Sequence, residues 1–248
     1  MDRIFNMDNK FFVFMGKVAD LIILNLLCIV CSIPIVTAGA SITAMFYVTL
    51  KMARNEESYI VKGFFKSFKE NFKQATIIHL IMMVTALLLF FDIRIVNQME
   101  GKLYRGLFVI FLAFGILYLL IFMYIYPILS KFYNSIKATF TNAFLMSIRH
   151  LPYTVLMIII SAVPFALMFI PDARIMSTVM MVLILLGFST VAYCNSFFFV
   201  KIFDNYIPKD DSEDADPDSI EASLKALDSL ADPEGPESSS CENSGDEA

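Results

Sequence analysis

The sequence predicts an all-α fold: a polytopic helical membrane bundle of five to six membrane segments, with cytoplasmic amphipathic helices and a disordered acidic C-terminal tail. The chain has 248 residues, of which 58% are hydrophobic and 25 are Phe. Its apolar stretches are long enough for helices that cross about 30 Å of hydrocarbon. Helices are expected rather than strands because a bilayer offers no water to satisfy an open sheet edge.

Five candidate spans are strong and a sixth is weaker. The N-terminus has no compact basic region and no small-residue cleavage site after its apolar stretch, so the first span is not expected to be a removed signal peptide. The strong spans cover about residues 18–36, 75–93, 106–129, 154–171 and 175–200, and the weaker one covers 39–53.

The chain divides by composition into two expected domains, a helical membrane domain at 1–203 and a cytoplasmic tail at 204–248. The tail holds fifteen Asp or Glu and two Lys, a net charge of −13, which leaves +8 on the membrane domain out of −5 overall. A segment with this much charge and so few apolar residues cannot bury a core, so disorder is expected.

The stretch "SIPIVTAGASITAMFYVTLK" at 32–51 interrupts the first apolar run and restarts it. Its chemistry suits a membrane turn. Pro34 removes a backbone donor, Gly39 permits conformations closed to other residues, and Thr37 or Ser41 can cap the restarting helix. The first arm already spans the bilayer, so the turn is expected near the outer face. A broken helix that points its positive end at a substrate is the alternative.

Lys and Arg are unevenly distributed between the two sets of loops. Those at 51–73 and 130–150 lie on one side because two spans separate them, and the tail joins them two spans later. These segments hold eleven Lys or Arg, against four on the opposite loops. If 39–53 returns through the membrane, the N-terminal cations join the same side. The positive-inside rule therefore favours a hairpin, with both the C-terminus and the N-terminus in the cytoplasm of a multi-pass cell-membrane protein.

The loop segment "KGFFKSFKENFK" at 62–73 forms an amphipathic helix on a helical wheel, with Phe and Lys on separate arcs. One interpretation places it in the headgroup layer, with its Phe side down and its Lys near anionic phospholipid headgroups. The other has the Phe side cover the base of the bundle, and the two are compatible. The candidate lipid-interface residues are Lys62, Phe64, Phe65, Lys66, Phe68, Lys69, Phe72 and Lys73.

Few polar residues fall within the spans, and the candidate intramembrane polar residues are Asn25, His79 and Asn195. Ionisable groups in a membrane are functional suspects by default. His79 follows Lys73 by little more than a turn, so it is expected near the cytoplasmic interface as a hydrogen-bonded structural residue. No phosphate-binding glycine loop, zinc spacing or serine nucleophile elbow occurs. We therefore expect no catalytic residues, no metal site, no cofactor and no nucleic-acid partner.

Residues 20–80 carry a succession of short motifs: LNLL, then PIVTAG, then FYVTLK, then FFKSFKENFK. In this order they resemble the N-terminal half of the YesL family, bacterial integral membrane proteins of unknown function. Family members commonly carry Trp directly after LNLL, where this chain has Cys28. The resemblance implies proximity to ATP-driven (ABC-type) carbohydrate uptake systems, whose subunits are candidate partners.

Two functional hypotheses from different classes follow. The first is an accessory or regulatory component associated with carbohydrate uptake, or a small carrier. The second is a non-transporting scaffold that presents the basic amphipathic helix and the acidic tail to cytoplasmic partners. An independent sugar carrier is disfavoured, because the hydroxyls of a sugar need many buried polar partners.

Overall fold

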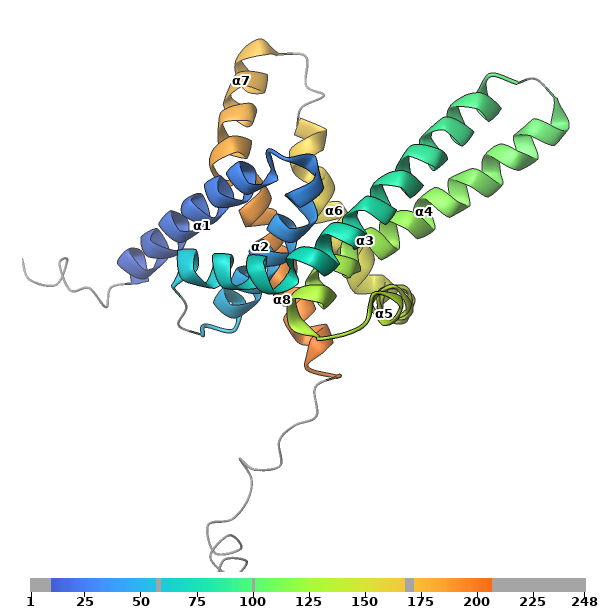
Figure 1. Ribbon diagram of the computed structural model, residues 1–248. Coiled ribbons are helices and arrows are strands. Elements are labelled where there is room, and N and C mark those ends of the chain that lie inside the picture. Colours follow the sequence, from blue (N-terminus) through green and yellow to red (C-terminus); the bar gives the residue numbers. More distant parts are fainter. Residues whose placement is uncertain (1–9, 57–58, 100, 168–171, 207–248) are drawn as a thin grey trace, which may run out of the picture. The chain divides into compact units, whose positions relative to one another are not determined.

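The computed structural model describes residues 10–56, 59–99, 101–167 and 172–206. All regular secondary structure in these ranges is helical, and no strand occurs in them (Figure 1). The predicted all-α membrane class is therefore confirmed. The predicted tail at 204–248 lies almost wholly outside the described residues, so its disorder and the domain boundary stay predictions.

The helices follow the chain in a simple order. The first is α1 (Lys10–Ser32), and a short 3₁₀ turn, η1 (Ile35–Thr37), separates it from α2 (Ala38–Ala53). The two long helices that come next are α3 (Ile60–Asn97) and α4 (Lys102–Lys131). They are followed by α5 (Ile136–Arg149), α6 (Leu151–Leu167), α7 (Ala173–Val182), a single π-helical turn, η2 (Leu183–Gly187), and α8 (Phe188–Phe203).

Five helical stretches of the described chain have the length and apolar composition to cross a membrane, and a sixth is obtained if α5 and α6 count together. These are Phe12–Ser32, Ile35–Ala53, Ile60–Asn97, Leu103–Lys131 and Arg174–Phe203, with the bent pair Ile136–Arg149 and Leu151–Pro164. The number agrees with the five to six segments predicted. The first predicted span ran to residue 36, whereas the helix ends at Ser32, two residues before Pro34.

The weakest predicted span proves to be the central helix. Ten of the sixteen residues of α2 are buried, and α2 lies against α1, α3, α4 and α8. Its inward positions carry small and hydroxyl side chains, such as Ala40, Ser41 and Thr43, which allow neighbouring helices to approach closely. Because protein rather than lipid surrounds it, α2 needs less apolar character than a lipid-facing helix.

The hydrophobic core consists of two clusters that meet at α2. One joins α2 to α3, α4, α5 and the end of α8 and contains Tyr124, Tyr126 and Phe199. The other joins α2 to α1 and the start of α3 and contains Leu24 and Phe64. In contrast, most of the large apolar side chains in the second half of α3 and the first half of α4 are exposed, as expected of helices that face lipid.

Candidate functional site

The chain turns back on itself after α1, and α2 runs antiparallel to α1. Lys17, two turns into α1, donates from Nζ to Oδ1 of Asn55, just after the end of α2, at 3.0 Å. Of the predicted turn residues, Pro34 and Thr37 lie between the two helices, and Gly39 and Ser41 lie in the first turn of α2. The orientation of this α1–α2 hairpin relative to a membrane stays a prediction.

The predicted capping role of the turn hydroxyls is wrong in detail. Thr37 makes no side-chain cap to α2, and its hydroxyl instead donates to the carbonyls of Cys31 at 2.7 Å and Pro34 at 2.8 Å. Ser41 donates to the carbonyl of Thr37 at 3.3 Å. Thr37 thus satisfies the carbonyl of Cys31 in the last turn of α1, where carbonyls lack helical partners because the helix stops.

Gly39 is needed for a close approach rather than for an unusual backbone conformation. Among the described residues only Asn55 and Gly101 have positive φ, and Gly39 lies in the first turn of α2. A Cβ atom at Gly39 would come within 2.5 Å of Cβ of His79 and 2.7 Å of the carbonyl oxygen of Ala75. The absence of a side chain at this position therefore lets α2 contact the backbone of α3.

This contact corrects the predicted depth of the turn. The sequence predicts the turn near the outer face and His79 near the cytoplasmic interface, yet Gly39 and His79 are in contact. From His79, α3 continues for 18 residues to Asn97, a further length of about 27 Å. The turn therefore lies part-way along α3 and does not reach its far end.

Asn25 joins α1 to the π-helical turn before α8. Its side-chain Nδ2 donates to the carbonyls of Leu183 at 3.3 Å and Ile184 at 2.6 Å, and its Oδ1 accepts from the backbone N–H of Ser189 at 3.0 Å. Ser189 also donates from its hydroxyl to the carbonyl of Leu21 at 2.8 Å. A π-helical turn interrupts the regular backbone pattern, and Asn25, which is fully buried, supplies hydrogen bonds there.

The other two intramembrane polar candidates also have internal partners. Nδ1 of His79 and the hydroxyl of Tyr126 lie 2.8 Å apart, which ties α3 to α4. Nδ2 of Asn195 donates to Oγ of Ser161 at 3.0 Å, which ties α8 to α6. Oδ1 of Asn195 is buried and has no hydrogen-bond partner among the described residues. All three candidates therefore join helices that are distant in sequence.

A cavity of about 350 Å³ lies between α2, α4, α6, η2 and α8. Its lining is apolar except for Tyr126, Ser161 and Asn195, and two of these three side chains bond to each other. Such a lining suits an apolar group. It offers too few polar groups for a sugar.

The Phe and Lys segment forms the first part of α3, and its aromatic residues divide between two surroundings. Phe64 is fully buried and Phe68 is partly buried against both core clusters. Phe65 and Phe72 are exposed, beside a row of lysines. The exposed lysines are Lys62, Lys66, Lys69 and Lys73. This arrangement accommodates both predicted interpretations, and the lipid contact itself stays a prediction.

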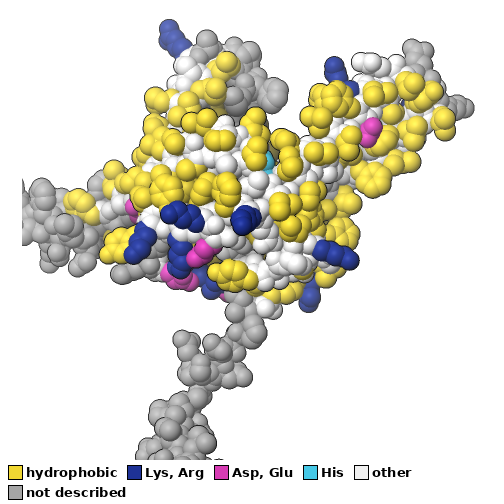
Figure 2. Space-filling view, in the orientation of Figure 1, with side chains coloured by type: hydrophobic (Ala, Val, Ile, Leu, Met, Phe, Trp, Pro, Cys, Tyr) yellow, Lys and Arg dark blue, Asp and Glu magenta, His cyan; other side chains and the backbone are white. Residues whose placement is uncertain are grey.

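Cations gather where helices end. Lys51, Lys131 and Lys201 lie in the last turns of α2, α4 and α8, where a positive charge complements the negative end of the helix dipole. We call these three residues, together with Lys17 and Arg54, the basic end. Figure 2 shows Lys and Arg gathered with acidic side chains over one part of the visible face, and hydrophobic side chains over much of the rest.

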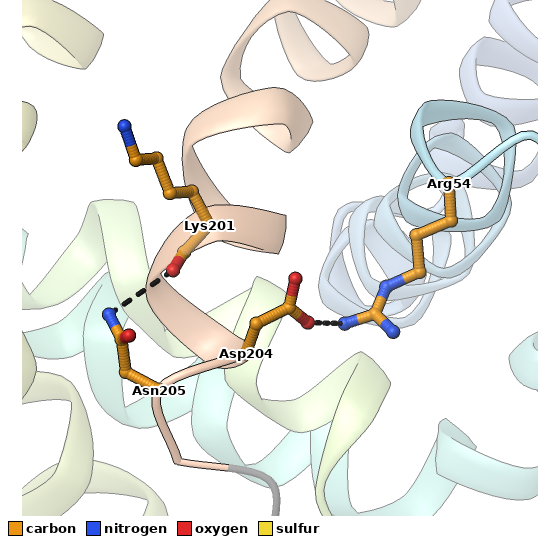
Figure 3. Close-up of polar contacts among 4 residues, drawn as sticks. All are labelled: Arg54, Lys201, Asp204 and Asn205. Carbon is orange, nitrogen blue, oxygen red and sulfur yellow. Dashed lines mark hydrogen bonds and ion pairs between the residues drawn. The ribbon is translucent and has the colours of Figure 1, made fainter. Parts of the chain in front are cut away.

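One ion pair closes the basic end. Arg54, the residue after α2, pairs with Asp204, the residue after α8, and this is the one salt bridge within the described ranges (Figure 3). Nearby, Asn205 donates from Nδ2 to the carbonyl of Lys201 at 3.2 Å. Arg54 lines one hollow at this end, and a second hollow shares Tyr47, Lys51, Ser130 and Lys131 with the first. The ends of α2, α4 and α8 therefore meet at one polar surface.

The described part of the chain contains no group of three or more His, Cys, Asp or Glu placed to hold a metal ion. Sequence reasoning found Asn25, His79 and Asn195 but missed their partners. Tyr126, Ser161 and Ser189 gave no signal, because each lies on a helix 34 residues or more from the residue that it contacts.

Residues 21–93 match the family described as "Protein of unknown function, DUF624". The chain is also 26% identical to the "Uncharacterized protein YesL" of Bacillus subtilis (strain 168) over 150 residues, 60% of this chain and 70% of the relative. These matches support a YesL-family assignment. The matched range covers the motifs that carried the resemblance, and in this YesL-like chain it includes the second half of α1, all of α2 and most of α3. No solved structure matches the chain.

Proposed function

We propose that this YesL-like protein is an accessory or regulatory component beside an ATP-driven carbohydrate importer, and is not itself the carrier. One observation supports the proposal most. The intramembrane polar residues Asn25, His79 and Asn195 each hydrogen-bond within the bundle, and the cavity beside Asn195 is apolar, with Oδ1 of Asn195 left without a partner among the described residues. A carrier would instead need hydrogen-bond partners for the hydroxyls of a sugar, because a buried unpaired polar group is costly.

The link to carbohydrate uptake rests on the family resemblance, and the relative is itself described as uncharacterised. Within that proposal, the basic end faces the cytoplasm, since the side richer in Lys and Arg is cytoplasmic. The hairpin brings the start of α1 to the same end as Arg54 and Asp204. Both termini are then cytoplasmic.

The alternative is a scaffold without a transport partner. The exposed lysines of α3 and the exposed Phe65 and Phe72 beside them favour this alternative, because they form a surface that internal packing does not use. The partner of this surface would be anionic phospholipid headgroups or a cytoplasmic protein. The two proposals differ in where the partner binds. An importer subunit docks through membrane helices, whereas the partner of a scaffold binds the lysines of α3 or the tail.

Affinity capture of the full chain from native membranes in mild detergent tests the proposal. Two matched variants accompany the wild type: a chain ending at Pro208, and a chain in which the four exposed lysines of α3 are replaced by Gln. The accessory role predicts enrichment of importer membrane subunits, retained in both variants. Capture of soluble proteins alone, lost in either variant, would favour the scaffold. Failure to enrich any importer subunit over an unrelated multi-pass protein would contradict the accessory role.

A further inference from the structure

The helices α5 and α6 meet at a sharp elbow. Their axes differ by 98° across His150, the single residue between them. The helix α6 is apolar along its length and packs against α4 and α8, which lie in stretches that could cross a membrane, so we take α6 as the crossing arm of the bent pair. A helix at a right angle to one that crosses the bilayer lies close to the plane of the bilayer. The geometry therefore places α5 along the membrane surface.

The two sides of α5 differ in their surroundings. Thr139, Ala143, Met146 and Ser147 are buried, and α5 contacts α4. On the opposite side Phe144, Leu145 and Ile148 are exposed by 37%, 61% and 45%. This outer side holds large apolar residues that contribute nothing to the core.

The exposed row of α5 continues onto α6. Exposed apolar residues recur at three- and four-residue steps, at Phe144, Ile148, Leu151, Val155 and Ile159. Steps of three and four residues keep side chains on one face of a helix. Phe144 and Ile148 therefore share one exposed face of α5, and Leu151, Val155 and Ile159 share one exposed face of α6 on the other side of the elbow.

All charged residues of α5 are cations. The helix contains no Asp or Glu, and its cations, Lys137 near the start and Arg149 at the end, are both exposed. An amphipathic helix with an apolar face and flanking cations binds at the boundary between headgroups and acyl chains, and anionic lipids strengthen the binding. A water-facing loop helix would not need three large apolar residues on its outer side.

We propose that α5 is a lipid-binding interfacial helix. Phe144, Leu145 and Ile148 insert below the headgroups, and Lys137 and Arg149 contact lipid phosphates. This helix is separate from the predicted Phe and Lys segment of α3. It also adjoins the end of α8. The Arg149 guanidinium lies 5.6 Å from the Tyr206 ring centroid, and Nε2 of His150 lies 3.2 Å from the Tyr206 hydroxyl. Arg149, which we assign to lipid phosphates, therefore adjoins His150, the residue at the elbow that contacts Tyr206 after α8.

The chain contains no Trp, so a single introduced Trp is a clean fluorescent reporter. We would place one at Leu145 and, in a second variant, at Ile148 of the full chain in lipid nanodiscs. A third variant, Tyr133→Trp, is the matched control, since Tyr133 is 92% exposed in the loop before α5. Emission is then quenched separately by lipids brominated near the carbonyl end of the chain and by aqueous iodide. Elution volume and circular dichroism confirm that each variant folds.

The proposal predicts that Leu145→Trp and Ile148→Trp lose most of their emission to brominated lipid and little to iodide, with the reverse for Tyr133→Trp. Quenching of both α5 reporters by iodide alone would show that the helix faces water. Protection of both from either quencher would show that a protein surface, including a second copy of this chain, covers the stripe. Either result would overturn the proposal.

Discussion

Replacing Gly39 by Ala tests the close approach of α2 and α3. A Cβ atom there would lie 2.5 Å from Cβ of His79 and 2.7 Å from the carbonyl oxygen of Ala75. Both distances are far below van der Waals contact, and the second partner is a backbone atom that no rotamer change can move. The helices would have to separate, and overpacking of this kind costs about 1–3 kcal/mol.

The same substitution also brings a small gain in stability from helix propensity, and a control at another glycine can isolate this gain. Ala is favoured over Gly within a helix by up to about 1 kcal/mol. In α4, a Cβ atom at Gly106 or Gly115 would meet nothing within 4 Å, so Ala at either position should be neutral or slightly stabilising. For Gly39→Ala we expect a net loss of about 1–2 kcal/mol.

Thermal unfolding in mild detergent, followed by circular dichroism, measures the difference. Gly39→Ala should unfold several degrees below wild type, and Gly106→Ala and Gly115→Ala should match or exceed wild type. If Gly39→Ala were as stable as Gly115→Ala, α2 and α3 would not be in the contact described, and the glycine would be a turn residue only.

Three further perturbations have expected outcomes. Asn25→Leu removes two bonds to the π-helical turn and one from the Ser189 N–H of α8, so the same melts should show a loss of about 1–2 kcal/mol, whereas Thr85→Val, which removes only a bond within α3, should change little. Equal melting temperatures for the two variants would show that the Asn25 bonds do not stabilise the fold. Tyr126→Phe removes the bond to His79 and should cost about 0.5–1 kcal/mol, and a larger loss would mean that the pair anchors more than two helices. Truncation after Pro208 should leave the melting temperature nearly unchanged, and unfolding of the truncated chain would refute the predicted disorder of the tail.

The number and class of the helices were predictable because a bilayer forces backbone groups to pair within each segment. The environment of each helix was not. Hydropathy ranks α2 lowest because its small and hydroxyl side chains face other helices rather than lipid. The elbow at His150 was also missed, although Ser135, whose hydroxyl caps α5, and Pro152 at the start of α6 are typical of helix beginnings.

The polar residues of the site were predictable by type and not by partner. Asn25, His79 and Asn195 stand out because polar side chains are rare within the spans, but their partners come from packing between distant segments. The helical wheel of α3 grouped four Phe residues on one arc. The structure instead centres the buried face on Phe64, Ser67 and Asn71, which leaves Phe65 and Phe72 outside. Amphipathic periodicity therefore predicted that α3 has a buried apolar face, but it did not predict which residues lie at the centre of that face.

We propose that the α1–α2 hairpin brings the loop after α2 and the end of α8 to the same side of the membrane, opposite the loop between α3 and α4. Reporter cysteines at Glu56, Asn205 and Gln98, each exposed, test it in a chain whose native cysteines are replaced. An impermeant maleimide applied to intact cells should label Gln98→Cys alone, and Glu56→Cys and Asn205→Cys should react only after permeabilisation. Labelling of Glu56→Cys and Asn205→Cys from opposite sides would contradict the hairpin and the basic end built on it.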